Sequence, residues 1–283
     1  MKAWTGASLL VVLLFLGLGT SSWSESQSFS FGVILHRNPA TTAEFWTPIV
    51  KYVSERSGVP LTLKVAKTGP EHTMMVRRAE VDFLYSNHNF VAENAASGYR
   101  VFARPRGDAG QGEIVVLTDS PIRSLAELQG KEVAFPHAAA FLGYHLPMDA
   151  MLRAGIQVKP LFAGNQEAAM GQLKAGRTVA AGVSAEVMRA FARRENIAYR
   201  VLWSSEKYLN LALSASPAVP EDKVKAVREA FLRMADNLEG VKVLASSAAV
   251  VKQPPISFVL AADDEFSNMR QFYRTTRVKI DLN

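Results

Sequence analysis

The feature that constrains this chain most is a regular alternation of short β-rich runs with segments of helical spacing. Strands that alternate with helices of this length form βαβ units and largely parallel sheets, so we expect an α/β protein. Apolar residues between Ala43 and Ser57 recur at helical spacing until Gly58 ends the pattern. The expected strands are 28–35, 61–66, 81–85, 99–103, 113–118, 131–135, 158–162, 178–183, 199–203 and 209–214, and the last helices are 221–238 and 263–275.

These elements fall into two sets, and no linker rich in Pro, Gly or Ser separates them. We therefore expect the backbone itself to cross between two lobes, near Thr118–Asp119 and again near 204–210. Two such crossings form a hinge, and closure of the lobes about the hinge surrounds a ligand. The expected organisation is a first lobe over 25–118, a second lobe over 119–205, and a return to the first lobe over 206–283.

The N-terminus has the pattern of a secretory signal. Lys2 supplies a positive start, an apolar run covers 7–18, and a polar stretch with small residues leads to a cleavage site expected after Ser24. The apolar run is shorter than the roughly 20 residues that a membrane-spanning helix needs. Removal of residues 1–24 predicts a periplasmic mature protein, and the alternative is an uncleaved N-terminal anchor.

The composition excludes several classes of protein. The chain has no cysteine, so it has neither a disulfide nor a cysteine-linked lipid, and we expect a monomer without a stable membrane anchor. A net charge of +6 is scattered rather than gathered into a basic run with aromatic residues, so nucleic acid is not an expected partner. The sequence has no nucleophile elbow, phosphate loop or H-E-x-x-H motif, and neither catalysis nor a cofactor is expected.

Polar loops follow the expected strands, at the edge where ligands bind in open α/β sheets. They begin helices whose first N–H groups are free, and such ends favour anions. Each Ser, Thr or Asn there also has a simpler role as an N-cap, but several loops around one cleft favour a binding site. From the first lobe we expect contacts by His36, Thr41, Thr42, Ser86, Asn87, His88 and Asn89. From the second lobe we expect contacts by His137, Gly143, Tyr144, Asn165, Gln166 and Ser184.

Four stretches carry a family resemblance. The longest runs from Asp119 to Phe135 and is similar to D-S-x-I-x-S-L-x-D-L-x-G-K-x-V-A-F. The others are V-D-F-L-Y at 81–85, F-A-G-N-Q-E-A-A at 162–169 and V-A-A-G-V at 179–183. In order and spacing the chain resembles the phosphate-, phosphite- and phosphonate-binding proteins of ABC importers. The resemblance implies a type II periplasmic-binding-protein fold, capture of a small phosphonate-type or other oxyanion by hinge closure, and a permease in the inner membrane as partner.

The sequence departs from that family where the ligand would lie. The family's serine- and threonine-rich turn is replaced by A-A-A-F-L-G at 138–143, its loop histidine by Gln166 and its strand aspartate by Ala180. These changes remove hydroxyl donors for a phosphonyl group. The resemblance therefore supports the scaffold better than it supports the ligand.

Two alternative functions stay open at this stage. The five histidines, His36, His72, His88, His137 and His145, lie in or just beyond loops expected at the cleft. Imidazole is the commonest transition-metal ligand, so one alternative is a zinc- or copper-binding protein, although the spacings match no recognised metal motif. The other alternative is a periplasmic ligand-sensing partner of a membrane histidine kinase.

Overall fold

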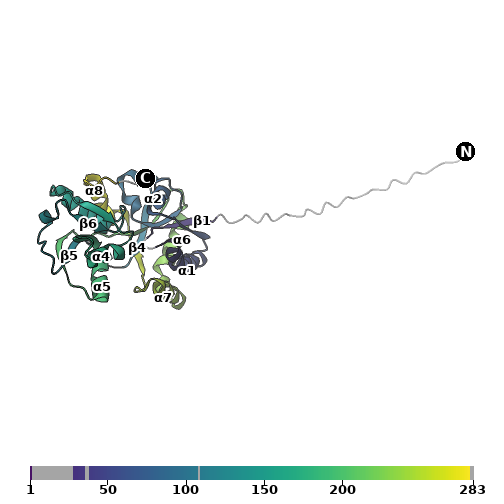
Figure 1. Ribbon diagram of the computed structural model, residues 1–283. Helices are drawn as coiled ribbons and strands as arrows, with labels where there is room; N and C mark the ends of the chain where they lie inside the picture. The colour runs from purple at the N-terminus through teal and green to yellow at the C-terminus, as the bar shows by residue number, and fades with distance from the viewer. Residues whose placement is uncertain (2–27, 36–37, 108, 281–283) are drawn as a thin grey trace.

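Two mixed β-sheets organise the chain, and helices flank each of them (Figure 1). The computed structural model describes residue 1 and residues 28–35, 38–107 and 109–280, so residues 2–24 of the expected signal and His36 lie outside the described residues. In this part of the chain no helix is long and apolar enough to span a membrane. The first sheet has six strands and the second has five, which confirms the expected α/β class.

The first sheet has the strand order β11-β4-β10-β3-β1-β2. Its strands are β1 (Phe29–Val33), β2 (Leu61–Val65), β3 (Phe83–Ser86), β4 (Arg100–Pro105), β10 (Ala212–Ala215) and β11 (Phe258–Leu260). β1 pairs in parallel with β2 and β3, whereas β10 runs antiparallel to β3 and β4. The carboxyl ends of β1, β2 and β3 therefore share one edge of this sheet.

The second sheet has the order β7-β6-β8-β5-β9. Its strands are β5 (Gly112–Leu117), β6 (Glu132–Phe135), β7 (Lys159–Phe162), β8 (Ala180–Ser184) and β9 (Tyr199–Ser204). β6 pairs in parallel with β7 and β8, and β5 runs antiparallel to β8 and β9. Three parallel strands again end at one edge, and the loops that follow them carry the second set of predicted ligand residues.

Helices cover both sheets, with α1, α6 and α7 on one side of Figure 1 and α4 and α5 on the other. The α-helices are α1 (Pro39–Ser57), α2 (Gly69–Arg77), α3 (Leu146–Arg153), α4 (Gln166–Lys174), α5 (Ala185–Glu195), α6 (Glu221–Leu232), α7 (Leu238–Val251) and α8 (Ser267–Thr275). Short 3-10 turns are η1 (His88–Phe90), η2 (Ala92–Ser97), η3 (Leu125–Leu128), η5 (Met234–Asp236) and η6 (Asp263–Phe266), and η4 (Phe141–His145) is one π-helical turn.

Local sequence explains where α1 begins and ends. Asn38 caps its first turn by accepting a hydrogen bond from the backbone N–H of Thr41 at 2.9 Å. Gly58 ends it in the left-handed region at a φ of 68°, which costs a glycine little. Trp46 on its buried face packs against Tyr85 of β3, with ring centroids 4.5 Å apart. The helix therefore covers the sheet beside the carboxyl ends of its parallel strands.

The prediction of a single helix over 221–238 was wrong in its extent. It ends at Leu232, and α7, which the sequence analysis did not predict, follows. The residues of α7 are mostly small and apolar, so they show little helical periodicity. The local indication of α7 in the sequence is its N-cap residue. Asn237 accepts a hydrogen bond from the backbone N–H of Gly240 at 2.9 Å.

The position of β5 corrects the expected lobe boundary. The sequence analysis placed the strand at 113–118 in the first lobe, but β5 pairs with β8 and β9 in the second sheet. The chain therefore leaves the first sheet between β4 and β5, not near Thr118–Asp119, and it returns between β9 and β10. These two crossings pair with each other, since Gly110 and Tyr208 exchange backbone hydrogen bonds of 2.9 and 2.8 Å. An apolar strand pattern shows which faces are buried but not which sheet the strand joins.

The end of the described chain also differs from the expected organisation, which placed all of 206–283 in the first lobe. Val278 and Ile280 pack among the buried apolar residues of the second sheet. Asp149 on α3 fastens this segment, because its Oδ1 accepts hydrogen bonds from Thr276 Oγ1 at 2.9 Å and from the backbone N–H of Arg277 at 2.6 Å. The partners lie far apart in the sequence, so no local pattern indicates this contact.

We predict that Gly112→Ala destabilises the fold, because a Cβ at this position would lie 2.4 Å from the carbonyl oxygen of Leu142. Displacing the backbone of η4 should lower the free energy of unfolding by about 1–3 kcal/mol. Gly171→Ala is the control, since Gly171 lies within α4 with open space at its Cβ position and alanine favours a helix by about 1 kcal/mol. Chemical denaturation measures both values. Equal stability of Gly112→Ala and the wild type would contradict the close packing of η4 on β5.

Candidate ligand-binding site

The turn that follows β3 is anchored by side chains of α2. Ser86 Oγ accepts a hydrogen bond from the backbone N–H of His88 at 3.0 Å and lies 2.9 Å from His72 Nε2. His88 Nδ1 lies 2.8 Å from Thr73 Oγ1, whose hydroxyl donates to the carbonyl oxygen of Gly69 at 3.1 Å. Because that hydroxyl has a single proton, Nδ1 of His88 is the donor to Thr73. The network is buried and holds the turn in one shape.

Two asparagines of the same turn connect it to β10 and to the hinge. Asn87 Nδ2 donates to Asn210 Oδ1 at 2.8 Å, and Asn89 Nδ2 donates to Ser214 Oγ at 3.3 Å. Both asparagine side chains are buried, and the Oδ1 atom of each has no hydrogen-bond partner among the described residues. Asn210 lies in the second crossing, so the turn is bonded directly to the hinge. Sequence analysis did not select Asn210, although its place in an expected crossing was the available signal.

The predicted residues at the start of α1 form the rest of the first-lobe set. Thr42 is buried and Thr41 is half-buried in the first turn of the helix. The backbone N–H of Thr41 is already satisfied by Asn38. His36 lies outside the described residues. The structure thus brings Ser86 to Asn89 together, and the participation of the α1 residues in a ligand site stays a prediction.

At the matching edge of the second sheet, Gly143, Gln166 and Ser184 converge. Gln166 Oε1 accepts a hydrogen bond from the backbone N–H of Ser184 at 3.0 Å. A Cβ at Gly143 would lie 2.7 Å from Gln166 Nε2, so η4 passes closely over this amide. Asn165 is exposed, and its Oδ1 caps α4 by accepting from the backbone N–H of Ala168 at 2.9 Å. The simpler capping role therefore accounts for the Oδ1 atom of Asn165, while the other three residues form one group.

Tyr144 and His137 lie in the loop after β6. The Tyr144 ring packs edge-on against Phe135 at 5.1 Å and against Phe162 at 5.0 Å between ring centroids. Burial raises the pKa of Tyr144 and lowers the pKa of His137 from its ordinary value. Both side chains are therefore neutral near pH 7, and they offer polar contacts without a full charge.

His145 has both of its ring nitrogens engaged and is buried. Nε2 lies 2.7 Å from the carbonyl oxygen of Ala138, which accepts only, so Nε2 carries the proton. Nδ1 of the neutral ring then accepts from the hydroxyl of Tyr273 at 3.1 Å. Burial lowers the pKa of His145 to about 4. The ring therefore links the loop after β6 to α8, and neither of its nitrogens is left to bind a metal.

The metal alternative required the histidines to converge, and the described ones do not. The His72 and His88 rings lie 5.1 Å apart in the first lobe, whereas His137 and His145 lie together in the second. Across 28–35, 38–107 and 109–280, no three His, Cys, Asp or Glu side chains are close enough together to hold a metal ion. The four described histidines therefore form two pairs rather than one site.

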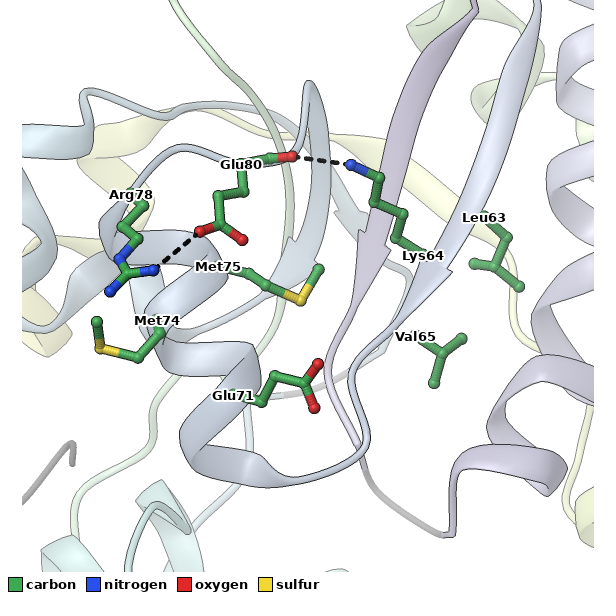
Figure 2. Close-up of a pocket in the computed structure, with 8 residues that line it drawn as sticks. All are labelled: Leu63, Lys64, Val65, Glu71, Met74, Met75, Arg78 and Glu80. Carbon is green, nitrogen blue, oxygen red and sulfur yellow. Dashed lines mark hydrogen bonds and ion pairs between the residues drawn. The ribbon is translucent and has the colours of Figure 1, made fainter.

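Two surface grooves are lined by other residues than the predicted ligand contacts. Figure 2 shows one of about 500 Å³ between β2 and α2, where Glu80 forms an ion pair with Arg78 at 3.5 Å and its carbonyl oxygen accepts from Lys64 Nζ at 3.3 Å. The other, of about 580 Å³, lies along η6 and α8. None of the predicted ligand residues lines either groove. The grooves therefore do not coincide with the predicted ligand site.

Comparisons with known proteins agree with this architecture. A family model described as ABC transporter, phosphonate, periplasmic substrate-binding protein matches residues 31–257. PhnD1 from Prochlorococcus marinus, solved in complex with methylphosphonate, has a TM-score of 0.71 at 15% identity, over 87% of this chain and 97% of that one. A binding-protein component of an ABC phosphonate transporter from Pseudomonas aeruginosa has a TM-score of 0.69 at 18% identity, over 88% and 87%. These likenesses confirm the type II periplasmic-binding-protein fold.

A third solved structure shows that the same fold accompanies a different ligand. A Xanthomonas citri protein bound to ATP has a TM-score of 0.69 at 18% identity, over 89% of this chain and 99% of that one. No curated protein matches the sequence. The ligand of this chain must therefore be argued from its own residues.

We predict that the free energy of unfolding falls by up to about 3 kcal/mol between pH 6.5 and pH 4, because folding lowers the pKa of His145 from 6.5 to about 4. The unfolded chain takes up the proton first in this window. The stability contributed by the neutral ring is therefore complete above pH 6.5 and is lost as the pH falls towards 4. Urea denaturation at several pH values measures this slope.

The control is His145→Gln, which removes this titration and leaves all others in place. Its stability should depend less on pH than that of the wild type in the same window. Identical slopes for the two proteins would show that the ring is not buried in its neutral form.

Proposed function

Because the chain belongs to the family of phosphonate ABC-transporter periplasmic substrate-binding proteins, we propose that it captures a small phosphonate-type anion between its two lobes. Members of this family are substrate-binding components of importers and not enzymes, and they pass a small ligand to a permease. The family is periplasmic. We propose further that the mature protein begins after Ser24 and acts as a monomer without a membrane anchor.

The buried polar turn from Ser86 to Asn89 is the observation that carries the proposal. It lies at the carboxyl end of β3, where ligands bind in sheets of this kind. Its Asn87 is bonded to Asn210 in the hinge. A ligand that contacts this turn is therefore coupled to the segment about which the lobes rotate. That coupling is what a protein that closes on its ligand requires.

Charge supports a small anion of low charge. None of the proposed ligand residues is a Lys or an Arg, and burial keeps His137 neutral. The positive potential therefore comes from helix starts, since α1, α4 and α5 begin at the strand-end loops and α5 follows Ser184 directly. Amide and hydroxyl donors orient the ligand in this arrangement, and none of the proposed ligand side chains neutralises a large negative charge.

The phosphonate class has two supports outside the chain's own geometry. The matching family is defined by phosphonate transport, and the PhnD1 structure contains methylphosphonate. The ATP in the Xanthomonas citri structure shows that the fold alone does not select a ligand. The test must therefore compare several anions, and we choose methylphosphonate, phosphite, phosphate and sulfate.

We predict that Asn87→Asp weakens binding of the preferred anion at least tenfold, which corresponds to about 1.4 kcal/mol. The change conserves shape and lets Asn210 turn its amide to donate, but it places a carboxylate beside the proposed anion. Isothermal titration calorimetry with the four anions measures the effect.

The control is Gln172→Glu, the same amide-to-carboxylate change towards the end of α4, where Arg177 donates to Gln172 at 3.5 Å. It should leave the affinity within twofold of the wild type. The proposed function is wrong if the wild type binds none of the four anions, and the proposed site is wrong if both variants bind as the wild type does.

A further inference from the structure

Helix α8 and the turn before it contact the elements behind both proposed ligand-binding edges. Phe266, just before α8, stacks on Phe90 with ring centroids 4.7 Å apart, and Phe90 directly follows the 86–89 turn of the first lobe. Towards the end of α8, the Tyr273 ring lies 5.5 Å from that of Phe141 in η4 of the second lobe. These rings belong to one buried apolar cluster. One helix therefore supports the turn after β3 and the loop after β6 at the same time.

The hydroxyl of Tyr273 anchors the second ring nitrogen of His145. It donates to Nδ1 of His145 at 3.1 Å, and the opposite nitrogen donates to the carbonyl oxygen of Ala138 at 2.7 Å. A neutral imidazole has one N–H and the carbonyl oxygen of Ala138 only accepts, so the proton lies on Nε2 and Nδ1 accepts from Tyr273. Without that hydroxyl the buried Nδ1 loses its donor, and the ring is held through Ala138 alone.

The segment that follows α8 keeps Tyr273 against the second lobe. Asp149 on α3 accepts hydrogen bonds from Thr276 and Arg277. Arg153, one turn further along α3, donates to the carbonyl oxygen of Thr275 at 2.6 Å. Helix α3 begins at the residue after His145, so these contacts fix the distance between α8 and the imidazole.

We propose that Tyr273 is a positioning residue for the ligand site, because through His145 it sets the shape of the loop from Pro136 to His145. The inference rests on the proposed function, since this loop contributes His137, Gly143 and Tyr144 to the proposed ligand contacts. Tyr273 is buried and acts through another side chain, so it contributes to affinity without contacting the ligand.

The decisive comparison is between Tyr273→Phe and Tyr208→Phe. Both rings contact Phe141, at 5.5 and 5.1 Å, and both substitutions remove only a hydroxyl. The Tyr208 hydroxyl donates to Glu206 at 2.6 Å rather than to the loop. We expect calorimetric titration with whichever of the four anions binds the wild type to show about fivefold weaker binding by Tyr273→Phe, and less than a twofold change for Tyr208→Phe.

A spectroscopic measurement separates positioning from a general loss of stability. Nitrogen-15 NMR of the His145 ring should show the Nδ1 resonance of a hydrogen-bonded acceptor in the wild type and in Tyr208→Phe, and a shift of that resonance in Tyr273→Phe. His145→Gln provides a second variant, because its amide can donate to Ala138 but has no second ring nitrogen for Tyr273 to bind. Adding Tyr273→Phe to His145→Gln should then cause no further loss of affinity.

The possible outcomes distinguish this inference from the function on which it rests. Unchanged affinity in Tyr273→Phe, together with weakened binding by Asn87→Asp, overturns the positioning role and leaves the proposed function intact. An unchanged Nδ1 resonance in Tyr273→Phe, or equal losses in the two tyrosine variants, also overturns it. Failure of the wild type to bind any of the four anions overturns the proposed function, and the positioning role with it.

Discussion

The pairing of the two backbone crossings is the constraint on which the rest of the structure depends. Gly110 and Tyr208 exchange two backbone hydrogen bonds, so the segments that join the sheets run side by side. Because both crossings are short, the second sheet cannot lie far from the first, and the start of β5 meets η4 at the same place. The polar turn after β3 is then within bonding distance of the hinge through Asn87 and Asn210. The proposed closure on a ligand depends on this geometry.

The proposed site is polar, and none of its residues is a Lys or an Arg. Burial lowers the pKa of His137, so this side chain stays uncharged near pH 7. Anion binding must then depend on oriented amides, hydroxyls and helix starts, which are fixed dipoles rather than mobile charges. Such a site favours a ligand whose charge is small and whose shape matches the donors. The buried hydrogen-bond network around Ser86 suits such a site, because it fixes the polar groups of the turn before a ligand binds.

The structure shows what residues 138–143 do in place of the family's serine- and threonine-rich turn. Phe141 and Leu142 pack into the cluster that includes α8, and Gly143 passes over Gln166. This loop lacks the hydroxyl donors that are usual in the family. It packs against α8, which also contacts the first-lobe elements next to the 86–89 turn. His145 also holds this loop in place, since both of its ring nitrogens form hydrogen bonds. The loop is held by its surroundings as much as by its own sequence.

Local patterns in the sequence determined the elements and the class of fold. Caps such as Asn38 and Gly58, the alternation of strands with helices, and the stretch from Asp119 to Phe135 each depend on residues close together in the chain. The polar turn from Ser86 to Asn89 was predictable for the same reason, because it follows a strand. Only the tertiary structure decided which sheet β5 joins, which lobe receives Val278, and that His145 is buried against Tyr273. Each of these depends on contacts between residues far apart in the sequence, and neither strand partners nor burial against a distant helix are encoded in a local pattern.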